Sequence, residues 1–188
     1  MNTWKVAFIS LASFIVIVLV AVIYLAISPT EDAAIPTTNN VTGSVLEVQT
    51  TTVEFEQIAR KYLADAIKDS PIDVKISIKE EIHLFSDLVI FGITVPIQMD
   101  FEPEVHQGNI RLKQTNVHVG KINIEPGAVL KLVKDSVDFP AWIIVRPDNE
   151  EIYVDLSSLN IADGNRVRAK EVDLKGNNII LEIVIPTR

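Results

Sequence analysis

The first hydrophobic feature of this chain is a long apolar run that is interrupted only by Ser10, Ser13 and Tyr24. The run extends from Val6 to Ile27 and contains no charged residue. A helix of 22 residues rises by about 33 Å, which is enough to cross the hydrocarbon core of a bilayer. We therefore predict a short cytoplasmic tail at residues 1–5 and a transmembrane helix at residues 6–27.

Two alternative interpretations of this run are a cleaved signal peptide and a buried helix of a soluble domain. The run is longer than the apolar core of a signal peptide, which is roughly 7–15 residues. The nearby small-x-small triplet Ala26-Ile27-Ser28 is followed by Pro29, which is a poor residue after a cleavage site. A domain of this size does not supply an apolar surround for such a helix. The pattern favours an uncleaved signal anchor.

Charges beside the run indicate its orientation. Lys5 precedes it, and the next basic residue is Arg60. Lysine and arginine are retained on the cytoplasmic side of a membrane, so we expect a cytoplasmic N-terminus and an extracytoplasmic remainder. Residues 28–44 are rich in Pro, Thr and Asn, which predicts a spacer before one folded domain at residues 45–188.

A helical pattern of apolar residues follows the spacer. Thr51 and Glu54 have the spacing of a capping box, and apolar residues recur at helical intervals up to Asp69-Ser70-Pro71. We predict an amphipathic helix there. A second helix is predicted to begin at Pro126. Its apolar face comprises Val129, Leu130, Leu132, Val133 and Val137.

Alternation of apolar and polar residues dominates the middle of the chain. It runs from Ile72 to Leu84 and predicts one long, half-buried strand. After Ser86-Asp87 the alternation changes parity and continues from Val89 to Phe101. This shift predicts a second long strand with a bend or bulge at Gly92.

Turn residues and shorter apolar segments complete the pattern. Gln107-Gly108-Asn109 predicts a turn into a third long strand from Ile110 to Ile124. Shorter strands are predicted at residues 45–50, 142–145, 152–156, 167–174 and 179–185. In the last of these we expect the side chains of Ile179, Leu181, Ile183 and Ile185 to face inward. Short connections favour antiparallel pairing. The predicted class is α+β: a transmembrane helix, then a long antiparallel meandering sheet with two amphipathic helices packed on one face.

Composition narrows the classes of function. The chain has no cysteine, which excludes disulfides and thiolate chemistry. Without Lys5, 16 basic residues remain against 25 acidic ones, a net charge of −9. This balance argues against nucleic acid as a partner. Phosphate-binding loops and nucleophile elbows are also absent from the sequence, so we predict no cofactor and no enzymatic activity.

The candidate chemical residues are three histidines, His83, His106 and His118. Exposed surface histidines are the default interpretation, and a three-histidine metal site is the alternative. The acidic pair Glu80-Glu81 lacks the ligand spacing of a calcium loop. We therefore predict no catalytic or metal-binding residues.

Aliphatic and aromatic residues are the remaining signal. A long sheet that curves over a helix can leave a groove for an acyl chain. Residues predicted to line such a lipid site are Phe91, Met99, Phe101, Phe139 and Trp142. We therefore expect a non-catalytic module of the cell envelope that binds a lipid or amphiphile. The alternative is an accessory subunit that positions an envelope protein partner, such as a lipase or a wall-synthesis enzyme.

A resemblance to a known family is carried by five segments: Asn-Thr-Trp-Lys-Val at the start, VIFGITVP at 89–96, QGNI at 107–110, PAWIIV at 140–145 and VDLKGNNI at 172–179. In these segments the chain resembles the YpmS-like proteins of low-GC Gram-positive bacteria, a domain family of unknown function. The likeness covers essentially the whole chain. It implies an extracytoplasmic protein anchored in the cell membrane and provides no catalytic residue to transfer.

Overall fold

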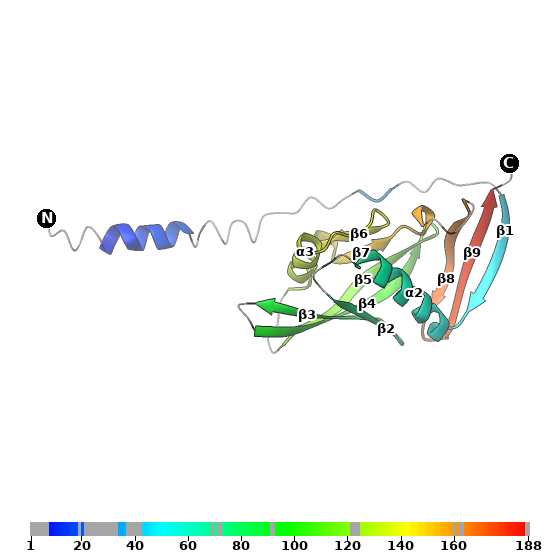
Figure 1. Cartoon of the computed structure of the whole chain (residues 1–188), viewed down its shortest axis with the longest axis horizontal. Coiled ribbons are helices and arrows are strands. Elements are labelled where there is room, and N and C mark those ends of the chain that lie inside the picture. Colours follow the sequence, from blue (N-terminus) through cyan, green and yellow to red (C-terminus); the bar gives the residue numbers. More distant parts are fainter. Residues whose placement is uncertain are drawn as a thin grey trace. The chain divides into compact units, whose positions relative to one another are not determined.

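A computed structural model describes residues 8–18, 20, 34–36, 43–68, 70, 73–90, 93–120, 125–159, 161 and 164–186. The chain divides into two compact units, Met1–Glu31 and Asp32–Arg188. In the first unit, residues 8–18 are α-helical (Figure 1). Residues 6, 7, 19 and 21–27 of the predicted transmembrane helix lie outside the described part. Among the described residues, no helix has the length and apolarity that a membrane span requires.

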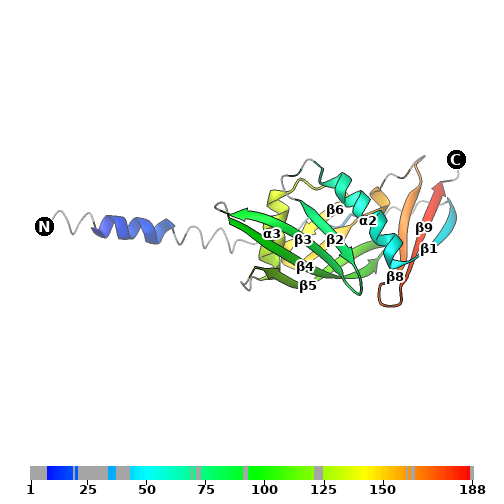
Figure 2. The ribbon, with the colours of Figure 1, turned by 60° about the horizontal axis from the view of Figure 1, so that its bottom comes forward.

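Two antiparallel sheets form the second unit. The six-stranded sheet has the order β2 (Val74–Ile78), β3 (Ile82–Ile90), β4 (Ile93–His106), β5 (Asn109–Val119), β7 (Glu151–Val154) and β6 (Ile143–Arg146). The three-stranded sheet has the order β1 (Gly43–Thr50), β9 (Asn178–Pro186) and β8 (Arg166–Asp173). The α+β class and the antiparallel pairing are confirmed. The described strands form two sheets rather than the single sheet that we predicted, because the last two strands pair with the first (Figures 1 and 2).

The first long strand predicted from the alternation is a hairpin. β2 ends at Ile78, β3 begins at Ile82, and these two residues pair with each other. Three residues connect them, and the backbone N–H of Lys79 donates to the carbonyl of Glu81 at 2.9 Å. A connection of this length leaves Ile78 and Ile82 on the same parity. The alternation therefore continues through the turn and conceals it.

The second predicted boundary is also displaced. β3 continues through Ser86 and Asp87 to Ile90, so the chain reverses between Ile90 and Ile93. Ser86 remains compatible with a strand because its hydroxyl donates to the carbonyl of Asp73 at 2.9 Å. The predicted bend at Gly92 lies outside the described residues.

The turn between β4 and β5 is confirmed. His106 pairs with Asn109, and both Gln107 and Gly108 have positive φ, at 51° and 80°. Two residues of positive φ define the tight turn whose twist matches that of a hairpin. β5 ends at Val119, and residues 121–124 of the predicted strand lie outside the described part.

The predicted capping box is confirmed at the start of α2 (Thr52–Ala66). The backbone N–H of Glu54 donates to the Thr51 hydroxyl, and the Glu54 carboxylate accepts from the Thr51 backbone N–H at 3.2 Å. The hydrogen bond from the Thr51 backbone N–H, together with those from the Thr50 and Thr51 hydroxyls, lowers the pKa of Glu54. The turn before β9 also secures this end of the helix, because the backbone N–H of Thr52 donates to the Asn177 side chain at 2.8 Å.

One hydrophobic core joins both helices to the sheets. It includes Val129 and Leu130 of α3 (Pro126–Ser136), whose start at Pro126 is as predicted. Phe55, Ala59 and Leu63 of α2 pack against the same core. α2 contacts β2 of one sheet and β9 of the other. Two short 3-10 helices, η1 (Pro147–Asn149) and η2 (Leu156–Ser158), flank β7.

The inward face predicted for the last strand is wrong at its C-terminal end. Ile179 is buried as expected, but Val184 is 1% exposed and Ile185 is 45% exposed. The buried parity therefore changes along β9. Consecutive apolar residues from Ile183 to Ile185 satisfy either parity, so the alternation does not determine which side chain faces inward.

A carboxylate links α2 to the edge of the six-stranded sheet. Glu56 Oε2 accepts from the backbone N–H of Ile78 at 2.6 Å, and Glu56 Oε1 forms an ion pair with Arg60. The Ile78 N–H and, to a smaller extent, Arg60 lower the pKa of Glu56. A carboxyl group with a lowered pKa in the folded state stabilises the fold above its ordinary pKa, and this contribution is lost as the pH falls through the lowered value.

We expect Glu56→Gln to reduce the free energy of unfolding by about 1 kcal/mol at neutral pH, because one charge-assisted hydrogen bond becomes neutral. Urea denaturation at several pH values measures the effect. The difference between wild type and variant should shrink in acid, where the wild-type carboxyl group is protonated as well. Gln57→Glu, at the next position of the same helix, is the control. A difference that persists unchanged in acid contradicts this role for Glu56.

Candidate functional site

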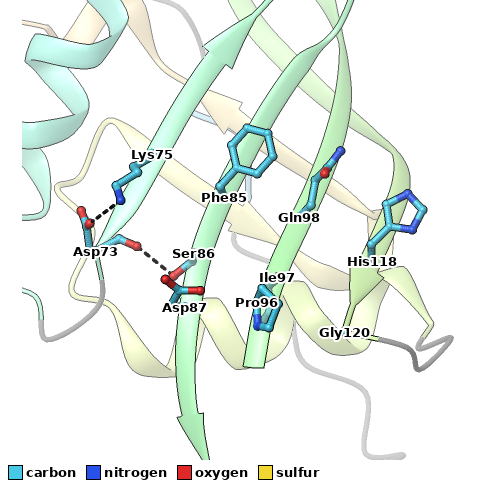
Figure 3. A pocket seen from close by; sticks show the side chains of 10 residues that line it. All are labelled: Asp73, Lys75, Phe85, Ser86, Asp87, Pro96, Ile97, Gln98, His118 and Gly120. Carbon is cyan, nitrogen blue, oxygen red and sulfur yellow. Dashed lines mark hydrogen bonds and ion pairs between the residues drawn. The ribbon is translucent and has the colours of Figure 1, made fainter. Parts of the chain in front are cut away.

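An open groove lies on the face of the six-stranded sheet that is opposite the core (Figure 3). Its volume is about 330 Å³. The sheet places it there because the side chains of Lys75, Phe85, Gln98 and His118 alternate with buried or partly buried residues on β2, β3, β4 and β5. The complete lining is Asp73, Lys75, Phe85, Ser86, Asp87, Pro96, Ile97, Gln98, His118 and Gly120.

The groove combines an aromatic surface with charged residues. Phe85 is 37% exposed. Beside it, Lys75 forms an exposed ion pair with Asp73 at 3.5 Å. Asp87 is exposed on the same face. This arrangement suits a molecule that has an apolar segment and a polar or charged group.

A buried carboxylate lies next to the groove, among polar residues. Asp100 is 5% exposed. Its Oδ1 accepts from Gln98 Nε2 at 2.8 Å and lies 2.7 Å from His83 Nδ1. His118 Nε2 lies 3.9 Å from Asp100 Oδ2. A carboxylate accepts a hydrogen bond at this distance from the His83 tautomer that carries its proton on Nδ1.

Strand register brings these residues together. His83 on β3 pairs with Asp100 on β4, and Gln98 on β4 pairs with His118 on β5. The third histidine, His106, lies elsewhere, with its ring edge-on to Tyr153. His118 is exposed as predicted, whereas His83 and His106 are partly buried.

Asp100, like Phe85, was not predicted from the sequence as a site residue. It lies between Met99 and Phe101 on the polar parity of its strand, which marks it as facing away from the core. Its proximity to two histidines depends on which residues of neighbouring strands pair with each other. The spacing of residues along a single strand does not predict this pairing.

The residues predicted to line a lipid site occupy other places. Met99 and Phe101 are 2% and 0% exposed within the core. Phe139 packs against that core, and Trp142 is half-buried. Phe91 lies outside the described residues. Lipid contact through these five side chains stays a prediction, and Phe85 is the aromatic residue of the groove that the structure shows.

Comparisons with known proteins support the resemblance seen in the sequence. The family described as "Uncharacterized protein conserved in bacteria (DUF2140)" matches residues 2–185. "Uncharacterized protein YpmS" of Bacillus subtilis (strain 168) is 25% identical over 180 residues, which cover 95% of each chain. No solved structure matches the chain. The predicted resemblance to YpmS-like proteins is confirmed, and the chain belongs to the DUF2140 family of bacterial proteins.

Proposed function

We propose that this protein is a single-pass, membrane-anchored module of the cell envelope that binds a lipid or another amphiphile outside the cytoplasm, without catalysing a reaction. The groove around Phe85 carries the proposal. Its volume of about 330 Å³ is at the lower end of the range for small-molecule sites. It fits a short part of an acyl chain together with a polar group.

The apolar N-terminal segment supports this function. Phe8, Leu11, Phe14 and Ile17 on the helix at residues 8–18 are each at least 60% exposed. A segment of this kind is suited to an apolar surround. A domain tethered to a bilayer encounters lipids at a high effective concentration, so a modest affinity of the groove is sufficient.

The polar groups of the groove suit binding rather than acyl transfer. Ser86 is the hydroxyl residue among those that line it. Its hydroxyl donates to the backbone carbonyl of Asp73, whereas a catalytic serine requires a neighbouring base. Lys75 and His118 are available for an anionic or hydroxyl-bearing headgroup.

We expect Phe85→Glu to weaken lipid contact at the groove about tenfold, because a carboxylate in place of the ring opposes burial of an acyl chain. Full-length protein is reconstituted in vesicles that contain a phospholipid with a photoactivatable acyl chain. Cross-linked residues are then mapped by mass spectrometry. In wild type, cross-links should include residues of β2, β3 and β4 beside Phe85.

Val105→Glu is the matched control, since Val105 on β4 is 38% exposed and does not line the groove. This variant should retain the cross-links of wild type. Cross-links confined to residues 6–27, or an equal loss in both variants, would contradict lipid binding in the groove.

A second candidate is an accessory subunit that binds another envelope protein. It is favoured by β1, an edge strand of its sheet among the described residues. Val45 and Leu46 on this strand are 52% and 55% exposed. An exposed edge accepts a strand from a partner. Protein–protein cross-links from β1 in whole cells, without lipid cross-links at the groove, would favour this function over lipid binding.

A further inference from the structure

Four side chains that can bind a metal ion converge on one face of the six-stranded sheet. His83, Asp100 and His118 come from the adjacent strands β3, β4 and β5, and Glu81 comes from the turn before β3. We propose that Glu81, His83, Asp100 and His118 bind one divalent transition-metal ion, with Zn²⁺ as the best match. This metal site does not depend on the proposed lipid binding.

The distances between the ligand atoms support a shared ion. One ligand atom each from Glu81, His83 and Asp100 lies within 4.8 Å of the other two. His118 Nε2 lies 3.9 Å from Asp100 Oδ2. Zn²⁺ has ligand bonds of about 2.0–2.2 Å in a tetrahedral arrangement, which places the ligand atoms roughly 3.3–3.6 Å apart. Glu81, His83 and Asp100 are therefore close to the spacing that the ion requires. His118 is near Asp100 but outside this mutual group, so it would join as the fourth ligand after its side chain rotates.

Small movements complete the site. His83 Nδ1 and Asp100 Oδ1 are 2.7 Å apart, so they must separate by roughly half an ångström or more to admit the ion. When the ion binds Nδ1, that atom gives up its proton, and the neutral ring then carries its single proton at Nε2. His118 has a side chain that is 62% exposed and can rotate toward Asp100. Glu81 lies in the short β2–β3 connection and is not part of the hydrophobic core.

The ligand types select the metal. Two imidazoles and two carboxylates suit Zn²⁺ and similar transition metals, whereas Ca²⁺ and Mg²⁺ prefer oxygen ligands alone. Gln98 supports the site from outside, because its Nε2 donates to Asp100 Oδ1. Such hydrogen bonds orient a metal-binding carboxylate. The side chain of Asp100 is 8% exposed, which protects this ligand from water.

Zinc titration of the full-length, tag-free protein in mild detergent tests the site. The protein is first treated with a chelator, and binding is measured by calorimetry. We expect one Zn²⁺ per chain, with affinity reduced at least tenfold in His83→Gln and in Asp100→Asn. His118→Gln should weaken binding less, because His118 is the most exposed of the four ligands. In wild type, Co²⁺ should give the intense visible absorption of a tetrahedral site.

His106→Gln is the matched control, since His106 belongs to the same sheet but contacts Tyr153 instead of the cluster. It should bind Zn²⁺ as wild type does. Circular dichroism verifies that each variant folds, and Glu81→Gln, at a surface turn, provides a variant that preserves the core if His83→Gln does not fold. The proposal is overturned if wild type binds no stoichiometric Zn²⁺. It is equally overturned if His106→Gln weakens binding as much as the cluster variants do.

Discussion

Phe101→Ala is expected to lower the free energy of unfolding by about 3–5 kcal/mol, which is the range for removing a large buried aromatic side chain. Phe101 is fully buried in the core. It lies on β4 opposite Ile82 of β3 and Gln114 of β5. Alanine would leave a cavity between these strands that the rigid sheet does not close. Chemical denaturation of the full-length protein, monitored by circular dichroism, measures the change.

Phe85→Ala is the control for this prediction, because it removes the same ring from the exposed face of the same sheet. We expect a loss of about 1 kcal/mol or less for this partly exposed position. A similar loss of unfolding free energy in the two variants would contradict the prediction that Phe101 stabilises the core more than Phe85 does.

The double substitution Phe14→Arg and Ile17→Arg is expected to release the protein from membranes. Each arginine near the middle of a transmembrane helix costs about 2.5–3.5 kcal/mol of insertion free energy. Both positions lie in the helix at residues 8–18, and their side chains are 64% and 65% exposed. Extraction of isolated membranes at alkaline pH, followed by immunoblotting of pellet and supernatant, measures integration.

Wild type should remain in the membrane pellet, and the arginine variant should appear in the supernatant. The control is Phe14→Leu with Ile17→Leu, which preserves apolarity and should behave as wild type. A wild-type protein that is extracted at alkaline pH would refute the membrane anchor, whatever the groove binds.

Local patterns in the sequence predict those parts of the fold that depend on neighbouring residues. The capping box at Thr51 and Glu54, the helix start at Pro126 and the turn at Gln107-Gly108 are all confirmed. Each is determined by hydrogen bonds or backbone angles within four residues. The β2–β3 turn was missed for a related reason, because its three residues preserve the parity of Ile78 and Ile82.

Local sequence patterns do not predict which strands, far apart in the chain, pair with each other. β1 was predicted as a strand, but nothing in its own residues specifies β9 as its partner. The cluster of His83, Asp100 and His118 also depends on long-range pairing of strands. His83 and Asp100 are 17 residues apart in sequence, and they meet because the chain reverses between Ile90 and Ile93 and not at Ser86-Asp87. An error in the position of one turn therefore concealed the cluster.

Pairing of β1 with β9 sets an order on folding. The first strand of the second unit aligns Gly43 with Pro186, close to the last residue of the chain. The three-stranded sheet cannot be completed until β9 has been synthesised. Because synthesis proceeds from the N-terminus, the hydrogen-bonding groups of β1 have no partner strand until the C-terminal residues emerge. Contacts of such large sequence separation form slowly, so the edge of β1 stays open to incorrect pairing until β9 arrives.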